Sequence, residues 1–221
     1  MNGKVIAVIQ GKGGASKTTT SINLLGGLEA AGYKTILCDM DKDKPDAMNW
    51  SAKGTDLKDK VVLITEDNPT KHIEALKNKH DFVLIDVPPN FQGAALKAAL
   101  LSDLVIIPCA PSEIEIDSLA NSSTCAEMAN KPFRFLATRV VKNTRIGKAL
   151  IEQIEKTGVG FKSSITYSTA MIESQSAGTW VGGYAKSSSS TQQVMELVHE
   201  VVETVKSLQG DKENVKERIL V

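Results

Sequence analysis

A glycine-rich segment near the start of the chain has the residue types that hold a phosphate group. Residues 11–18 read GKGGASKT and lie between an apolar run and a helix-like run. They match the pattern G-x-x-x-x-G-K-[ST] except at Ser16, where the pattern has a second glycine. In such a loop, backbone N–H groups surround a phosphate, Lys17 neutralises its charge, and the Thr18 hydroxyl ligates Mg²⁺. The segment therefore predicts a site for a nucleotide.

The serine at position 16 weakens the match but does not remove the prediction. Ser16 lies at the edge of the predicted helix, where we expect helical φ and ψ and a cost of about 1 kcal/mol for its Cβ. The loop is therefore still expected to bind a nucleotide. The residues expected to contact it are Gly11, Lys12, Gly13, Gly14, Ala15, Ser16, Lys17, Thr18 and Thr19.

Acidic residues follow two of the predicted strands. Asp86 ends the run DFVLID, which is how an aspartate is presented to Mg²⁺-bound water. Asp39 and Asp41 stand two residues apart, so in an extended segment they point the same way. One could then hold metal-bound water while the other orients an attacking water. An acid at a strand end can also cap a helix or lie in a solvated turn, so the phosphate loop is what makes these residues informative.

Strand-like runs alternate with amphipathic helical runs through most of the chain. Continuous Val/Ile/Leu runs are typical of strands buried on both faces, and their alternation with helices predicts an α/β fold with a doubly wound, mostly parallel sheet flanked by helices. The predicted strands are 4–10, 35–40, 61–66, 81–87, 104–109, 133–139 and 161–165, and the predicted helices are 17–31, 45–52, 69–78, 91–101, 113–129, 144–157, 168–177 and 189–208. The phosphate loop and the acids would then meet at the carboxyl edge of the sheet.

The bulk composition favours one domain in a reducing compartment. The 221 residues include 42% apolar residues and 26 basic against 26 acidic side chains. We expect one domain over 1–208 and a charged tail over 209–221, either a frayed helix or disordered. Three scattered cysteines, Cys38, Cys109 and Cys125, have no disulfide or CxxC spacing, and no apolar run is long enough to span a bilayer. We therefore expect a cytoplasmic protein.

Four segments together resemble one known family. KGGASKTTT, CDMDKDKPDAMNW, DFVLIDVPPN and LVIIPCAPSEIEIDSLA occur in this order. In this the chain is similar to the deviant Walker A ATPases of the ParA/MinD group, above all to the small ParF-like plasmid-partition ParA proteins. The resemblance extends from about residue 4 to residue 208. It implies a P-loop ATPase that uses ATP and Mg²⁺.

The resemblance also implies roles for individual residues. Lys12 corresponds to the signature lysine that reaches the partner's phosphates in a nucleotide-sandwich homodimer, and such a cation would stabilise charge on a triphosphate. Asp41 corresponds to the hydrolytic aspartate, which makes Lys12, Lys17 and Asp41 the expected catalytic residues. Thr18, Asp39 and Asp86 are the expected metal site. Thr138 and Arg139 correspond to the segment that contacts the adenine base.

The sequence departs from the family pattern in three places. Ser16 replaces the glycine of KGGxGKT, and DMDKD replaces the frequent DxDPQ. Tyr167 and Ala170 stand where many ParA proteins have two arginines. We still expect the chain to bind a nucleotide. The change at Ser16 predicts an altered affinity for ATP or an altered rate of hydrolysis.

The resemblance implies nonspecific DNA and an adaptor protein as partners. DNA binding through phosphates needs only basic residues on one face, although a basic cluster is often just a solvated face. The candidates are Lys142, Arg145, Lys148, Lys162 and Lys186. The tail is rich in acids and fits poorly with membrane insertion, so we expect nucleoid association. The expected cargo is a plasmid with a ParB-like adaptor, and the alternatives are a protein organelle such as a carboxysome and a chemoreceptor array.

Two other classes of function remain open on the sequence. Ser16 is compatible with a nucleotide-gated scaffold that binds ATP with little turnover. A metabolic P-loop enzyme, such as a dethiobiotin synthetase or a relative of the nitrogenase iron protein, is the other. The iron protein would need cluster cysteines after strands, and this chain has none there.

Overall fold

The computed structural model describes residues 3–12, 14–64, 69–89, 92–111 and 123–219. Seven parallel strands form one sheet in the order β3-β2-β4-β1-β5-β6-β7. Their bounds are β1 Lys4–Val8, β2 Thr35–Asp39, β3 Val61–Leu63, β4 Phe82–Asp86, β5 Leu104–Cys109, β6 Phe133–Val140 and β7 Gly160–Thr166. The predicted fold class is confirmed, and each predicted strand corresponds to one strand of this sheet.

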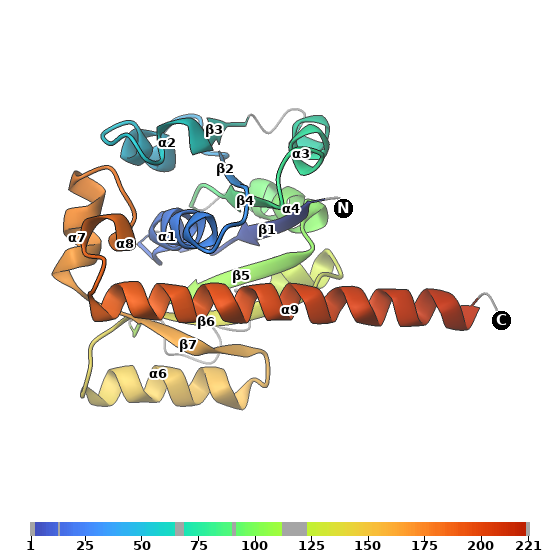
Figure 1. Cartoon of the computed structure of the whole chain (residues 1–221). Coiled ribbons are helices and arrows are strands. Elements are labelled where there is room, and N and C mark those ends of the chain that lie inside the picture. Colours follow the sequence, from blue (N-terminus) through green and yellow to red (C-terminus); the bar gives the residue numbers. More distant parts are fainter. Residues whose placement is uncertain (1–2, 13, 65–68, 90–91, 112–122, 220–221) are drawn as a thin grey trace.

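Helices cover both faces of the sheet (Figure 1). Their bounds are α1 Lys17–Ala30, α2 Asp46–Ser51, η1 Lys58–Lys60, α3 Pro69–Lys77, α4 Gln92–Leu101, α6 Arg145–Lys156, α7 Thr169–Ser176, α8 Val181–Tyr184 and α9 Ser189–Ile219. Alternate residues of one strand enter different cores: Ile6 and Val8 pack with α1 and α9, whereas Val5 and Ala7 pack with α3, α4 and α6. Burial on both faces explains why the strands are continuous apolar runs.

The described helices differ from the predicted ones in several segments. Most of the predicted helix over 113–129 lies outside the described residues, and 123–128 is helical. The short helix α8 was not predicted, because four residues with two glycines carry no helical signal. The last helix does not end at residue 208 but continues to Ile219 and projects past the sheet (Figure 1). Its apolar side chains pack against the core as far as Leu208. The predicted helix end at residue 208 coincides with the end of this apolar repeat.

None of the described helices combines the length and the apolarity that a bilayer crossing requires.

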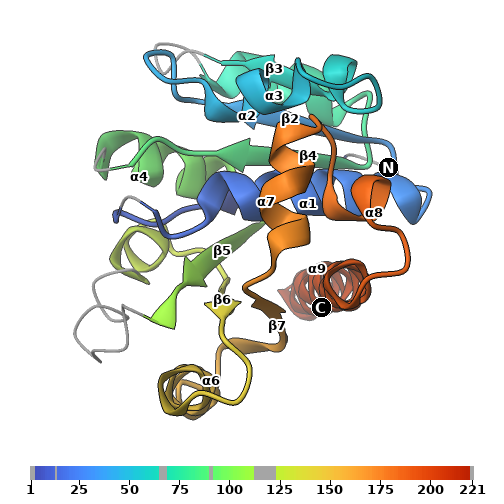
Figure 2. The same cartoon turned by 90° about the vertical axis from the view of Figure 1, so that its left-hand side faces the viewer.

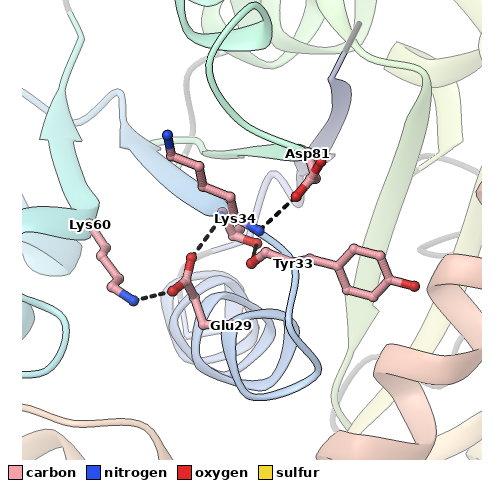
Figure 3. Close-up of polar contacts among 6 residues, drawn as sticks. Glu29, Tyr33, Lys34, Lys60 and Asp81 are labelled. Atoms are coloured by element: carbon pink, nitrogen blue, oxygen red, sulfur yellow. Dashed lines mark hydrogen bonds and ion pairs between the residues drawn. The ribbon is translucent and has the colours of Figure 1, made fainter. Parts of the chain in front are cut away.

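Polar contacts tie the amino edge of the sheet together, away from the phosphate loop (Figure 3). Glu29 at the end of α1 accepts a hydrogen bond from the Thr35 N–H at 2.6 Å and forms an ion pair with Lys60. Asp81, before β4, accepts the Lys34 N–H at 2.8 Å. These contacts join α1 to the starts of β2, β3 and β4. The opposite, carboxyl edge is left for the candidate site, and Figure 2 looks onto that edge, where α7 lies in front.

Candidate functional site

The phosphate loop connects β1 to α1, and two of its described residues are left-handed. Gly14 has φ 79°, and Ser16 has φ 64° and ψ 24° directly before α1. Our expectation of ordinary helical angles for Ser16 was therefore wrong, and its hydroxyl makes no capping hydrogen bond. A non-glycine residue in this conformation costs on the order of 1–2 kcal/mol. A glycine at this position, as in the phosphate-loop pattern, would avoid this cost because it has no Cβ.

Replacing Ser16 by glycine is expected to stabilise the protein. The Ser16→Gly variant should gain about 1 kcal/mol in free energy of unfolding, because the strain is larger than the entropy that glycine adds to the unfolded chain. For a domain of this size that is a rise of roughly 2–4 °C in Tm. Thermal melts of the nucleotide-free protein measure it. Asn143→Gly, at an exposed position that also has a positive φ, is the control. An unchanged or lower Tm for Ser16→Gly alone would contradict the strain argument.

The two lysines of the loop have different environments. Lys17, at the start of α1, is 7% exposed, and its Nζ donates to the Lys12 carbonyl oxygen at 3.3 Å. Gly11, Lys12 and Gly14 are exposed at the rim of the loop. The Lys17 ammonium is therefore held inside the turn, while the Lys12 side chain lies where another molecule can reach it. Gly13 lies outside the described residues.

Asp86 is brought next to the loop by the register of the sheet. It ends β4, pairs with Val8 on one side and with Asp39 on the other, and is 4% exposed. Its Oδ1 accepts a hydrogen bond from the Ser21 hydroxyl at 3.1 Å, and the Thr18 hydroxyl also bonds to the carboxylate. Ser21 had not been singled out in the sequence, although it stands one helical turn after Lys17 on the same face of α1.

The pKa of Asp86 is raised to about 7, with burial as the largest cause. The negative charge of Asp39 contributes to this rise, whereas the hydroxyls of Thr18 and Ser21 and the charge of Lys17 act against it. The described residues contain no group of three His, Cys, Asp or Glu side chains that could enclose a metal ion. The oxygen donors of Thr18 and Asp86 nevertheless suit Mg²⁺, which usually takes one or two carboxylates and completes its shell with phosphates and water.

Removing the Asp86 charge should make folding stability less sensitive to pH. The folded pKa is raised above the unfolded value, so this group's stabilisation is complete below about pH 4 and is lost as pH rises through about 7. Asp86→Asn should therefore gain stability over wild type between pH 4 and pH 8, by about 1.4 kcal/mol per unit of pKa shift. Denaturant unfolding of nucleotide-free protein with a chelator measures it. Asp43→Asn, at an exposed position, is the control; parallel curves for Asp86→Asn and wild type would contradict this prediction.

Asp39 serves to organise the backbone around it. Its Oδ1 accepts the Asp41 N–H at 3.0 Å, and its Oδ2 accepts the N–H groups of Ala47 and Met48 at 3.0 and 3.1 Å, at the start of α2. Burial raises its pKa, and these three N–H donors act against that rise. The half-buried Asp41 in turn accepts the Lys44 N–H at 2.9 Å. Asp39 thus fixes the turn that carries Asp41, and its role at a metal stays a prediction.

Most of the residues predicted to bind the nucleotide and the metal line one cavity of about 510 Å³ at the carboxyl edge, whereas Gly11 and Lys12 are not among the residues that line it. Residues from the loop, together with Asp39, Asp41, Asp86, Thr138 and Arg139, share its wall. The cavity lining also includes residues of α1, α7 and α9. The lining there was not predicted and includes Asn23, Leu24, Trp50, Met171, Val194 and Leu197. The apolar residues among them follow a helical pattern that is typical of core residues, and the polar Asn23 belongs to no motif, so the sequence held no signal for this lining.

Thr138 and Arg139, the two residues expected to contact the adenine base, differ in orientation. The Thr138 hydroxyl is buried and donates to the Cys109 carbonyl oxygen at 3.2 Å. The exposed Arg139 has φ 52°, and its Nη1 donates to the Gly14 carbonyl oxygen of the phosphate loop at 3.2 Å. Contact with adenine stays a prediction for both, while the observed contact of Arg139 is with the loop.

The basic residues that are expected to contact DNA are all exposed, but they do not lie on the same helix or strand. Lys142, Arg145 and Lys148 lie together at the start of α6 and just before it. Lys162 lies on β7, where its backbone N–H donates to Glu200 of α9 at 2.7 Å. Lys186 lies between α8 and α9. Only the first three form a compact basic group by position.

A family model and curated relatives match most of the chain. The model for the CobQ/CobB/MinD/ParA nucleotide binding domain matches residues 6–181. The maintenance of carboxysome distribution protein A of Halothiobacillus neapolitanus is 26% identical over 212 residues, covering 89% of this chain and 95% of the relative. The protein of the same name from Gloeobacter kilaueensis is 33% identical over 141 residues, covering 62% of this chain and 63% of the relative.

Solved structures with the same fold include nucleotide complexes. The septum site-determining protein MinD of Pyrococcus horikoshii, complexed with Mg-ADP, has a TM-score of 0.67 at 22% identity, covering 90% of this chain and 95% of MinD. A plasmid partition protein of Borrelia burgdorferi, bound to AMPPNP, has a TM-score of 0.67 at 19% identity, covering 91% and 99% of the two chains. At these identities the likeness establishes the fold.

Proposed function

Because this chain belongs to the CobQ/CobB/MinD/ParA nucleotide-binding domain family, we propose that it is an Mg²⁺-dependent ATPase that positions a cargo inside the cell. One observation carries the proposal: a phosphate loop with a buried lysine shares a single cavity with Asp41 and Asp86. The loop amides and Lys17 bind the phosphates of ATP. The complexes of MinD with Mg-ADP and of the Borrelia protein with AMPPNP support this choice of ligand.

Different residues of the cavity would hold the metal ion and orient the attacking water during hydrolysis. Mg²⁺ supplies positive charge at the β- and γ-phosphates, where Thr18 and Asp86 would hold it. Deprotonated Asp86 is needed for this, so metal binding strengthens as pH rises through about 7. Asp41 orients the attacking water, in a turn that Asp39 holds by accepting its N–H at 3.0 Å. Phosphoryl transfer depends on such positioning and on charge stabilisation.

Dimerisation is proposed from the position of Lys12. Its side chain is exposed at the rim of the loop, where it can reach the phosphates bound by a second copy of the chain. In that homodimer each Lys12 would add a cation to the other copy's triphosphate, so dimer formation and hydrolysis depend on each other. The alternative is a nucleotide-gated scaffold with little turnover, for which the strained Ser16 is the motivating observation.

We propose nonspecific DNA and a small adaptor protein as partners. Lys142, Arg145 and Lys148 can contact phosphates from the exposed start of α6, with Lys162 and Lys186 as weaker candidates. The adaptor, ParB-like or of another type, stimulates hydrolysis and release from DNA. The protein would then lie on the nucleoid in the cytoplasm.

The proposed cargo is a protein organelle of the carboxysome kind. Two relatives that match this chain are named for the maintenance of carboxysome distribution, and one of them aligns over 95% of its length. A plasmid is the second candidate, because the Borrelia protein with the same fold is described as a plasmid partition protein.

The experiment that tests the proposal compares wild type with Lys12→Ala. With ATP and Mg²⁺, wild type should form dimers in size-exclusion chromatography with light scattering, and its steady-state ATP turnover should rise with DNA and adaptor. Lys12→Ala should stay monomeric while ATP affinity changes by roughly threefold or less, since the backbone carbonyl that holds Lys17 remains.

Lys71→Ala, an exposed lysine on α3, is the matched control and should dimerise as wild type does. Equal dimerisation of Lys12→Ala and wild type would contradict the role of Lys12 across the dimer. Tight ATP binding without turnover under any condition would support the scaffold and contradict the ATPase.

A further inference from the structure

Arg139, at the end of β6, forms a hydrogen bond with the distant phosphate loop. Its guanidinium Nη1 donates to the Gly14 carbonyl oxygen at 3.2 Å, across 125 residues of chain. Its backbone has φ 52°, a conformation that costs free energy in any residue other than glycine. Strain of this kind persists only where surrounding structure maintains it, and it is concentrated at functional sites.

A bulge in β6 turns Arg139 towards the loop. Ala137 pairs with Ser164 of β7 and Val140 pairs with Thr166, so three steps along β6 match two steps along β7. The extra residue falls at Thr138 or Arg139, and bulges of this type redirect a side chain next to active sites. The Thr138 hydroxyl remains on the sheet, bonded to the Cys109 carbonyl oxygen. The redirected side chain is therefore that of Arg139.

The contact holds the loop in the form that binds an anion. When the backbone N–H groups of a phosphate loop point inward, its carbonyl oxygens point outward and can accept hydrogen bonds from donors outside the loop. The Lys17 ammonium donates to the Lys12 carbonyl oxygen, and the Arg139 guanidinium donates to the Gly14 carbonyl oxygen. Bound phosphate would compete for Lys17, whereas the Arg139 contact comes from another strand and can remain.

We propose that Arg139 is a positioning residue that orders the phosphate loop before the nucleotide arrives, and that it does not read the adenine base. This inference rests on the proposed function for its ligand. It predicts that Arg139 affects the binding of all nucleoside triphosphates equally, because the loop contacts only their phosphates. A residue that reads the base would instead change the preference for ATP over GTP.

The test uses Arg139→Asn, because asparagine accepts a left-handed backbone while lacking the guanidinium. Hydrogen–deuterium exchange of residues 11–16 is measured in nucleotide-free protein, and affinities for fluorescent ATP and GTP analogues are measured with Mg²⁺. We expect faster exchange of the loop amides, and a loss of affinity of roughly tenfold for both nucleotides, as for removal of one charged hydrogen bond. Thermal stability should stay unchanged, and Arg139→Lys should recover part of the affinity.

Arg134→Asn is the matched control. Arg134 is on the same strand, and its Nη1 also donates to a backbone carbonyl oxygen, that of Phe133, at the other end of β6. This variant should leave loop exchange and both affinities unchanged. Unchanged loop exchange in Arg139→Asn would overturn the proposal, as would a loss of affinity for ATP alone. If wild type bound no nucleotide, the proposed function would fail, while the exchange measurement would still decide whether Arg139 orders the loop.

Discussion

Lys17→Ala is expected to abolish nucleotide binding, with a loss of affinity of about 100-fold or more. Lys17 is 7% exposed and is the one cation held inside the described part of the phosphate loop. Removing it deletes a charge-assisted contact with two phosphates, each worth on the order of 1.5–3 kcal/mol. Isothermal titration with ATP and Mg²⁺ measures the effect.

The matched control for Lys17→Ala is Lys42→Ala, an exposed lysine that follows Asp41 at the same edge of the sheet. It should bind ATP as wild type does. The melting temperature of Lys17→Ala should not fall much, because the variant loses a buried cation along with its hydrogen bond to the Lys12 carbonyl. A folded Lys17→Ala protein that binds ATP within about threefold of wild type would contradict the site.

Asp41→Ala is expected to stop ATP turnover while ATP binding persists. A residue that positions or activates water contributes about 10²–10⁴-fold to the rate, and Asp41 lines the cavity in a turn fixed by Asp39. Without hydrolysis, the ATP-bound dimer should accumulate. Steady-state phosphate release and chromatography with light scattering, both in ATP and Mg²⁺, measure the two effects.

Asp43→Ala is the control for Asp41→Ala, because Asp43 is an exposed acid two residues further along the same turn. It should leave turnover and dimer lifetime unchanged. Intact turnover in Asp41→Ala would show that another residue positions the water. Equal losses in both variants would point to a distorted turn and not to a role for one carboxylate.

The fold could be predicted because its signals are local. Residues 36–38 and 104–109 are apolar without alternation, which is typical of strands buried on both faces. The helix after the loop could also be predicted from a local signal, because it follows directly on a glycine-rich turn and begins at Lys17. α9 was predicted too short, because residues 209–219 no longer repeat apolar side chains and helix continuation does not need them.

The site was predicted in its residue types and not in its contacts. Lys17 could be selected from the phosphate-loop pattern, and Asp41 and Asp86 because acids after strands are informative when a phosphate loop lies at the same edge. The sequence could not show that Asp39 accepts three backbone N–H groups, or that Ser21 bonds to Asp86 at 3.1 Å. Those hydrogen bonds join segments that meet only when the sheet forms.

The sequence by itself determined the fold class, the phosphate loop and the acids that share its cavity, because hydrophobic periodicity and short motifs act over a few residues. Only the tertiary structure decided that Ser16 is left-handed, with φ 64°, and that Arg139 meets Gly14. Backbone angles at a strained residue depend on what surrounds it, and a contact across 125 residues depends on strand order and a bulge. A single sequence carries neither of these as a local pattern.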